Sequence, residues 1–213
     1  MQNVSKIDFG RSRCRFAGLG VLATALFLLV APAEAGTREA EAFVKERGAD
    51  AIKVLSTRGL TEQRYVREFY DFVDKSFDVP AMAQFALGVH WRQATEQQRA
   101  EYVTLYKDYF VGTYAARFRT FSGENFEVTG ARAINDTESL VQSRIIRPGN
   151  QAPITVEWHV REQNSPKVVD MTIEGLRLGV TLRDEFAGVI QSGGLDALFK
   201  ALRERNAKFG IGA

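Results

Sequence analysis

The chain has 213 residues, 28 of them Lys or Arg and 26 Asp or Glu, so its formal net charge at pH 7 is only +2. Four of these basic residues and two of the acidic ones lie in residues 1–35, which leaves 24 of each sign in residues 36–213. This balance excludes the strongly basic surface of a nucleic-acid-binding protein. The single cysteine, Cys14, also lies in the first 35 residues, so residues 36–213 offer no disulfide, thiolate metal site or cysteine nucleophile.

The first 35 residues have the pattern of a secretory signal peptide. A basic start that includes Arg11 and Arg13 precedes an apolar run at 16–31, and Ala33 and Ala35 then hold the two key positions of a small-residue cleavage signature. The apolar run is shorter than the roughly 20 residues that a membrane-spanning helix needs, which favours a cleaved leader over a membrane anchor. We therefore expect a leader at 1–35 and a single domain at 36–213, located outside the cytosol.

The first half of this domain is predicted to be helical. Apolar residues at helical spacing indicate helices at 37 to about 55, at 62 to about 77, from Pro80 to about Gly88, and at 96 to about 121. Thr61 and Thr95 are the expected N-caps of the second and fourth helices, and Gln98 completes a capping box with Thr95.

The second half alternates with a period of two and then returns to helix. Strands are predicted at about 125–134, 139–147, 153–163 and 167–175, separated by turn residues rich in Asn, Gly and Pro. In the fourth strand, Val169, Met171 and Ile173 are expected on one face. Helix follows Gly175, with a break at Gly193 and Gly194. The predicted fold class is α+β, with helices packed on one face of a curved, about four-stranded antiparallel sheet.

The sequence offers little catalytic chemistry. His90 and His159 are the only histidines, and the acidic pairs fall at predicted turns or at a helix start. Zinc sites need three or four converging ligands, and a catalytic histidine needs an oriented partner and a nucleophile. We therefore expect a protein that is not an enzyme and that needs neither metal nor another cofactor. A small hydrolase depending on His159 has little support.

Several segments resemble the periplasmic MlaC-type family, also called the toluene-tolerance auxiliary family. The helical half carries FDVPAMA at 77–83, LGVHWR at 87–92, ATEQQR at 94–99 and TYA at 113–115. The strand-rich half carries PITVEW at 153–158, VVDMTIEG at 168–175, TLRDEF at 181–186 and GLDAL at 194–198. Each segment alone is weak, but their order and spacing across residues 40 to 205 are fairly specific.

The resemblance implies a periplasmic lipid carrier without catalysis or metal. Such proteins bind phospholipid acyl chains in an apolar pocket between the sheet and the helices. They shuttle lipid between an outer-membrane lipoprotein complex and an inner-membrane ABC transporter with an MCE-domain partner, which maintains the lipid asymmetry of the outer membrane.

The chain departs from the family at two places and resembles one subgroup at two others. Segment 165–169 lacks the tryptophan that often precedes the fourth-strand aspartate, and Arg177 stands where members often have serine. Segments 122–126 and 145–149 resemble a subgroup linked to hopanoid synthesis. The resemblance therefore leaves two cargoes open, a diacyl phospholipid and a rigid hopanoid-like lipid.

Large apolar side chains that face inward are the candidate lipid-binding residues. The main candidates are Phe110, Tyr114, Val156, Trp158, Met171 and Ile173, and the secondary candidates are Phe69, Val73, Phe77, Met82 and Phe85. Composition does not separate a pocket that holds lipid from a core that these side chains fill themselves. A non-enzymatic adaptor of an ABC transporter with a filled core thus remains the alternative.

Overall fold

The computed structural model describes residues 32–57, 59–118, 123–163 and 165–211. The charged and apolar parts of the predicted leader, and the predicted end of the fourth helix near Phe121, lie outside these ranges. The helices are α1 (Pro32–Ser56), α2 (Glu62–Ser76), α3 (Val79–Leu87), α4 (His90–Gln93), α5 (Glu96–Phe118) and α6 (Leu178–Lys208). The strands are β1 (Asn125–Asn135), β2 (Glu138–Ile146), β3 (Ile154–Arg161), β4 (Lys167–Ile173) and β5 (Leu176–Arg177).

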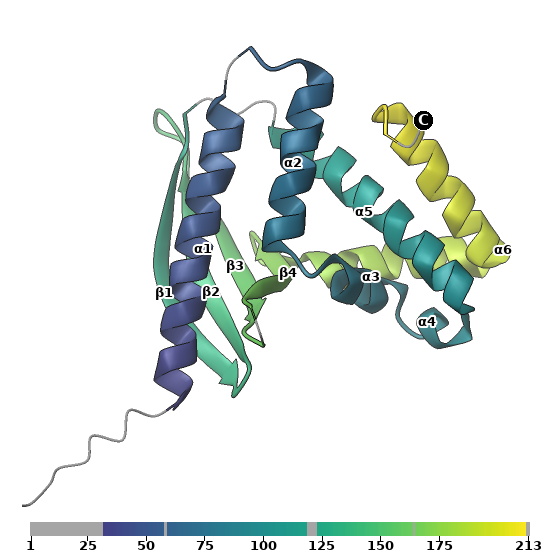
Figure 1. Ribbon diagram of the computed structural model, residues 1–213, viewed down its shortest axis with the longest axis horizontal. Helices are drawn as coiled ribbons and strands as arrows, with labels where there is room; N and C mark the ends of the chain where they lie inside the picture. The colour runs from purple at the N-terminus through teal and green to yellow at the C-terminus, as the bar shows by residue number, and fades with distance from the viewer. Residues whose placement is uncertain (1–31, 58, 119–122, 164, 212–213) are drawn as a thin grey trace, which may run out of the picture.

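The predicted α+β fold class is confirmed. The strands form one curved antiparallel sheet in the order β1-β2-β3-β4-β5, so the described residues have five strands rather than about four. Helix α1 runs along the sheet over β1 and β2, and the other helices continue from the β4 side (Figure 1). The short α4 and the two-residue β5 were not predicted, because elements of this length carry no periodicity.

The helix starts follow the predicted capping chemistry. Thr61 caps α2 by accepting from the backbone N–H of Arg64 at 3.3 Å. Thr95 and Gln98 form the expected reciprocal capping box, with donor–acceptor distances of 2.9 and 3.2 Å. Asp78 caps α3 by accepting from the Ala81 N–H at 3.1 Å. These side chains satisfy backbone donors that the first helical turn leaves unpaired.

The junction between α2 and α3 is fastened to the sheet. Phe77 makes a parallel bridge with Val168 of β4, and the Asp78 N–H donates to the Val168 carbonyl at 2.9 Å. The Lys167 ammonium donates to the carbonyls of Asp74 and Lys75, both at 2.7 Å, at the C-terminal end of α2. This arrangement satisfies orphan helix carbonyls and places positive charge at the negative end of the helix dipole.

One strand pairs differently from the prediction. The β3–β4 ladder shifts register at His159/Val160, so Asp170 opposes His159 whereas Val168 opposes Val160. The inward apolar position is therefore Val168, which is 1% exposed, and not the predicted Val169, which is only half-buried. A β-bulge adds one residue to one strand and reverses the alternation beyond it. The prediction for Val169 was wrong because a bulge depends on the partner strand.

The predicted glycine break in α6 is confirmed. Gly193 and Gly194 have non-helical backbone angles inside the helix, and Gly194 has φ 74° and ψ −172°. This region of backbone space is essentially restricted to glycine. The chain therefore turns sharply within α6, and the two halves of the helix run in different directions (Figure 1).

The two glycines Gly194 and Gly188 of α6 are expected to respond oppositely to alanine. Gly194→Ala should lower the free energy of unfolding by about 1–3 kcal/mol because its backbone angles strain any L side chain. Gly188 has helical angles and open space where a Cβ would lie, so Gly188→Ala should raise stability by about 0.5–1 kcal/mol. Urea unfolding of both variants measures the difference, and equal effects would contradict the strained-glycine interpretation.

No helix within the described ranges is long and apolar enough to cross a membrane.

Candidate functional site

Most of the predicted lipid-binding residues lie together. Seven of them belong to one buried apolar core, which we call the interior cluster: Phe69, Val73, Phe77, Met82, Phe110, Tyr114 and Met171. They come from α2, its C-cap, α3, α5 and β4. The sheet and the helices thus contribute to one continuous apolar interior, as the amphipathic patterns require.

The aromatic rings of the interior cluster form a chain of contacts. The ring centroids of Phe77 and Phe110 lie 5.4 Å apart, and those of Phe110 and Tyr114 lie 4.7 Å apart. Burial raises the pKa of the Tyr114 phenol to about 12, although the nearby Arg117 opposes this shift. Tyr114 therefore stays neutral, and the cluster is an uncharged environment at physiological pH.

The remaining candidate lipid-binding residues of the sheet lie on β3 and β4 and continue the apolar interior along these strands. Val156 is buried, Ile173 is half-buried and lies opposite it, and Trp158 lies opposite Met171. The Trp158 Nε1–H donates to Ser143 Oγ at 2.8 Å, and the Ser143 hydroxyl donates to the Val156 carbonyl at 3.2 Å. This chain of hydrogen bonds satisfies the indole nitrogen and fixes the Trp158 ring on the inner face.

The structure does not bring Phe85 into the interior cluster. Its side chain is 37% exposed, and the guanidinium groups of Arg177 and Arg183 lie 5.3 and 5.5 Å from its ring centroid. Such contacts are typical of a cation–π arrangement at the surface. The helical spacing of α3 could not distinguish this surface position from an inward one.

A cavity of about 310 Å³ lies between α1 and α2, which we call the α1–α2 cavity. Its rim carries charges of both signs, and its apolar wall includes Phe72, which was not among the predicted residues. The Phe72 ring centroid lies 5.8 Å from Phe69 and 6.0 Å from Phe77, both members of the interior cluster. The half-buried Phe72 ring therefore connects the wall of this cavity to the interior cluster.

A second cavity, of about 580 Å³, lies on the other side of α1 against β1, and we call it the α1–β1 cavity. Its lining is Lys45, Ala49, Ile52, Asn125, Phe126, Glu127 and Val128. The Phe126 ring contacts Trp158 edge-on, with centroids 6.1 Å apart. Phe126 was also missed, because only the packing of α1 against β1 shows that its ring faces a cavity.

The second half of α1 lies between these two cavities and is less buried than the first half. Ala40, Val44 and Gly48 are buried, but no residue of α1 beyond Gly48 is. At Gly48 the helix comes so close to β1 that an added Cβ would overlap the Phe126 ring and lie 3.0 Å from its Cγ. Residues 49–56 therefore pack with half-buried and exposed side chains only.

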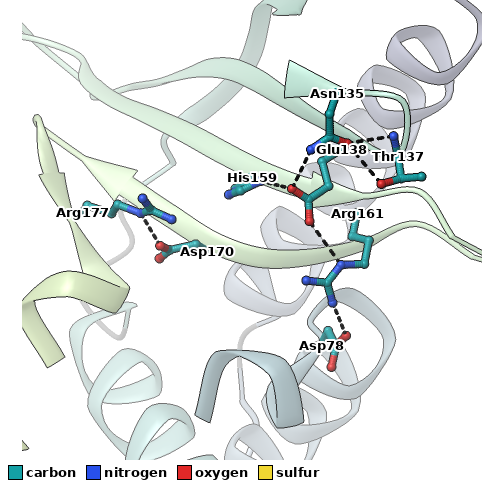
Figure 2. A network of polar contacts seen from close by, with 8 residues as sticks. All are labelled: Asp78, Asn135, Thr137, Glu138, His159, Arg161, Asp170 and Arg177. Carbon is teal, nitrogen blue, oxygen red and sulfur yellow. Dashed lines mark hydrogen bonds and ion pairs between the residues drawn. The ribbon is translucent and has the colours of Figure 1, made fainter. Parts of the chain in front are cut away.

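The polar groups of the sheet form a structural network on its other face (Figure 2). Glu138 accepts from His159 Nε2 at 3.1 Å and from Arg161 Nε at 3.3 Å, and Arg161 also pairs with Asp78 at 3.2 Å. His159 is thus occupied by a carboxylate, without a nucleophile in this network. Among the described residues, no group of three or more His, Cys, Asp or Glu side chains could hold a metal ion.

The network predicts a pH dependence of stability. Burial alone would raise the pKa of Glu138, but hydrogen bonds from His159, Asn135 and Arg161 outweigh it and hold the pKa below the ordinary 4.5. A depressed pKa stabilises the fold above pH 4.5, and this contribution is lost as the pH falls through the folded-state value. Urea unfolding between pH 6 and 3 should therefore show a shallower loss of stability for Glu138→Gln than for the unchanged protein. Parallel profiles would contradict the role of this carboxylate.

Comparisons with known proteins agree with this architecture. A family model described as MlaC protein matches residues 46–204. Among solved structures, the chain is similar to a phospholipid-binding protein from Ralstonia solanacearum, whose structure was determined in complex with a phospholipid at 1.53 Å resolution. The two share 28% sequence identity with a TM-score of 0.70, over 81% of this chain and 99% of that one. Because the family model spans well over half of its residues, the chain belongs to the MlaC family.

Proposed function

We propose that this protein is a lipid carrier that holds acyl chains in the apolar interior between the sheet and the helices. The observation that carries the proposal is that Phe72, which lines the α1–α2 cavity, also contacts Phe69 and Phe77 of the interior cluster. Support also comes from the phospholipid bound by the similar Ralstonia protein. Neither a metal nor a catalytic group takes part in such binding.

The hydrophobic effect supplies the binding energy. Burying acyl chains is worth about 0.8 kcal/mol per CH₂ group, so a two-tailed lipid gains far more than any headgroup contact could give. The cavities of about 310 and 580 Å³ flank α1, within the range of small-molecule sites. Outward movement of the second half of α1 would join them above the interior cluster.

The charged rim of the α1–α2 cavity suits a lipid headgroup. Arg47, Lys53, Arg64 and Lys75 supply positive charge there, and Asp50, Glu68 and Asp71 supply negative charge. A zwitterionic or anionic phosphate ester would find donors at this rim while its tails lie inside. This arrangement of apolar interior and polar mouth is typical of lipid sites.

The predicted leader and the family support a proposal for the cellular setting. We propose that residues 1–35 are removed as a signal peptide and that the mature protein works in the periplasm. There it would carry lipid between an outer-membrane lipoprotein complex and an inner-membrane ABC transporter with an MCE-domain protein, and so contribute to outer-membrane asymmetry and solvent tolerance.

A hopanoid-like lipid is the second candidate cargo. The segments at 122–126 and 145–149 resemble the hopanoid-linked subgroup, and they meet in the structure where Phe126 pairs with Ile145 across β1 and β2. Since Phe126 also lines the α1–β1 cavity, a difference in the shape of the cargo would change how well the cargo fits against this residue.

Native mass spectrometry of protein purified from the cell envelope tests the proposed function. We expect a copurified lipid, whose mass distinguishes a diacyl phospholipid from a polycyclic lipid. Protein that is always free of lipid, even after incubation with phospholipid vesicles, would favour the adaptor with a filled core.

A charge at Phe72 should reduce this lipid binding. Phe72→Glu places a carboxylate between the α1–α2 cavity and the interior cluster, where it would have to be desolvated beside the acyl chains. Phe85→Glu is the matched control because Phe85 is already exposed. We expect severalfold less lipid in the first variant and an unchanged amount in the second, with circular dichroism showing that both are folded. Equal lipid content would contradict the proposed role of Phe72.

A further inference from the structure

The first turn of the predicted mature domain meets a carboxylate, one oxygen of which has no hydrogen-bond donor among the residues that the structure describes. Gly36 of α1 lies against Glu162, which directly follows β3. A Cβ added to Gly36 would overlap Glu162 Oε2 and lie 3.1 Å from Cδ. Glu162 is held in place from its backbone, because its N–H donates to the Thr137 carbonyl at 2.9 Å. The carboxylate therefore points at the backbone of Gly36.

The other oxygen of this carboxylate is buried and unsatisfied. Glu162 Oε1 is inaccessible to solvent and has no hydrogen-bond donor among the described residues. Leaving a buried acceptor unpaired is costly, and more so when the group is charged. A donor that the uncleaved chain does not provide would remove this cost.

Cleavage after Ala35 creates such a donor at this position. In the uncleaved chain α1 begins at Pro32, so the Gly36 amide lies inside the helix, where each N–H pairs with the carbonyl four residues earlier. Removing residues 1–35 turns this amide into an α-amino group with an ordinary pKa of about 7.7–8.0, which is charged at neutral pH. The nitrogen and the added Cβ share one Cα, which places the nitrogen within about 5 Å of the carboxylate.

We propose that Glu162 is the docking site for the α-amino group of Gly36 that leader cleavage releases. The new ammonium group donates to the half-buried Glu162 carboxylate, and the carboxylate also faces the positive end of the shortened helix dipole. The start of α1 becomes fixed to the end of β3 only after processing. This inference depends on cleavage at Ala35–Gly36 but not on the identity of any cargo.

The test uses the full chain, exported and processed in a bacterial host. Intact mass should identify Gly36 as the first residue. An NMR titration of ¹³C-labelled Gly36 should then show an α-amino pKa above the ordinary range. Glu162→Gln should increase the acid dissociation constant of this α-amino group about tenfold. Glu185→Gln, an exposed position on α6, is the matched control and should leave it unchanged.

The free energy of unfolding provides a second readout, which does not require the Glu162→Gln variant to give an interpretable NMR spectrum. The raised pKa stabilises the mature protein below about pH 8, and this contribution is lost as the pH rises through the folded-state value. Mature protein with a free amine should therefore be more stable at pH 7 than the same protein acetylated at Gly36, and this difference should vanish in Glu162→Gln.

Two results would overturn the inference: a mature protein that begins at another residue, or an α-amino pKa that is the same with and without the Glu162 carboxylate. Lipid content, measured on the same samples, reports on the proposed function separately.

Discussion

Joining α1 to β1 through a disulfide is expected to stop lipid uptake. The Gly48→Cys and Phe126→Cys changes replace two residues that already touch, with an added Cβ on Gly48 only 3.0 Å from Phe126 Cγ. This places the two Cβ atoms near the 3.5–4.5 Å that a disulfide requires. If the second half of α1 must move to admit acyl chains, the oxidised protein should take up labelled phospholipid from vesicles at least about tenfold more slowly than the reduced protein.

The design offers its own controls. Because Cys14 is the only natural cysteine and lies in the predicted leader, the two introduced thiols would be the only ones in the mature protein. The reduced double variant has the same composition as the oxidised one and so accounts for the lost Phe126 ring, and Phe126→Cys alone, which adds no side chain at Gly48, should be insensitive to oxidation. Equal uptake with and without the disulfide would show that α1 does not cover the site.

Replacing Asp170 is expected to cause the largest loss of stability. This residue is 4% exposed, and its carboxylate accepts from Arg177 Nε at 2.6 Å, from the Met171 N–H at 2.8 Å and from the Gly179 N–H at 2.9 Å. Gly179 belongs to the first turn of α6, whose N-cap residue makes no capping bond with its own side chain. Asp170 therefore caps α6 from the neighbouring strand.

Asp170→Ala should lower the free energy of unfolding by about 2–4 kcal/mol, because it leaves buried N–H groups and a half-exposed guanidinium without their acceptor. Asp170→Asn keeps an acceptor and should lose less. Asp184→Ala, at an exposed position of α6, is the matched control and should change stability by less than about 0.5 kcal/mol. Urea unfolding measures all three, and an Asp170→Ala value as small as that of the control would refute the cap.

Features of the fold that depend on residues close together in the chain could be predicted from the sequence. The caps at Thr61 and Thr95 and the break at Gly194 arise from interactions within a few residues, and the structure confirms them. The β-bulge that brings Val168 inward arises from pairing between β3 and β4, which periodicity along one strand does not contain.

The same distinction applies to the candidate site. Helical spacing identified Phe69, Val73 and Phe77, which lie together in the interior cluster. It gave no reason to prefer Phe72, which lines the α1–α2 cavity, over Phe85, which lies at the surface. Whether an apolar helical residue faces the core, a cavity or solvent depends on how its helix packs, and one sequence does not determine that packing.

The fastening of the α2–α3 junction to β4 has a mechanical consequence. Since Phe77 and Asp78 are bonded to Val168, the C-terminal end of α2 is fixed to the sheet, whereas its N-terminal end is joined to α1 through residues 57–61. If lipid enters between α1 and α2, as the proposed function requires, the opening would be limited at both ends of α2 and would suit slender, bendable molecules. A broad, stiff molecule would need one of these two attachments to give way, so they would discriminate between cargoes by shape.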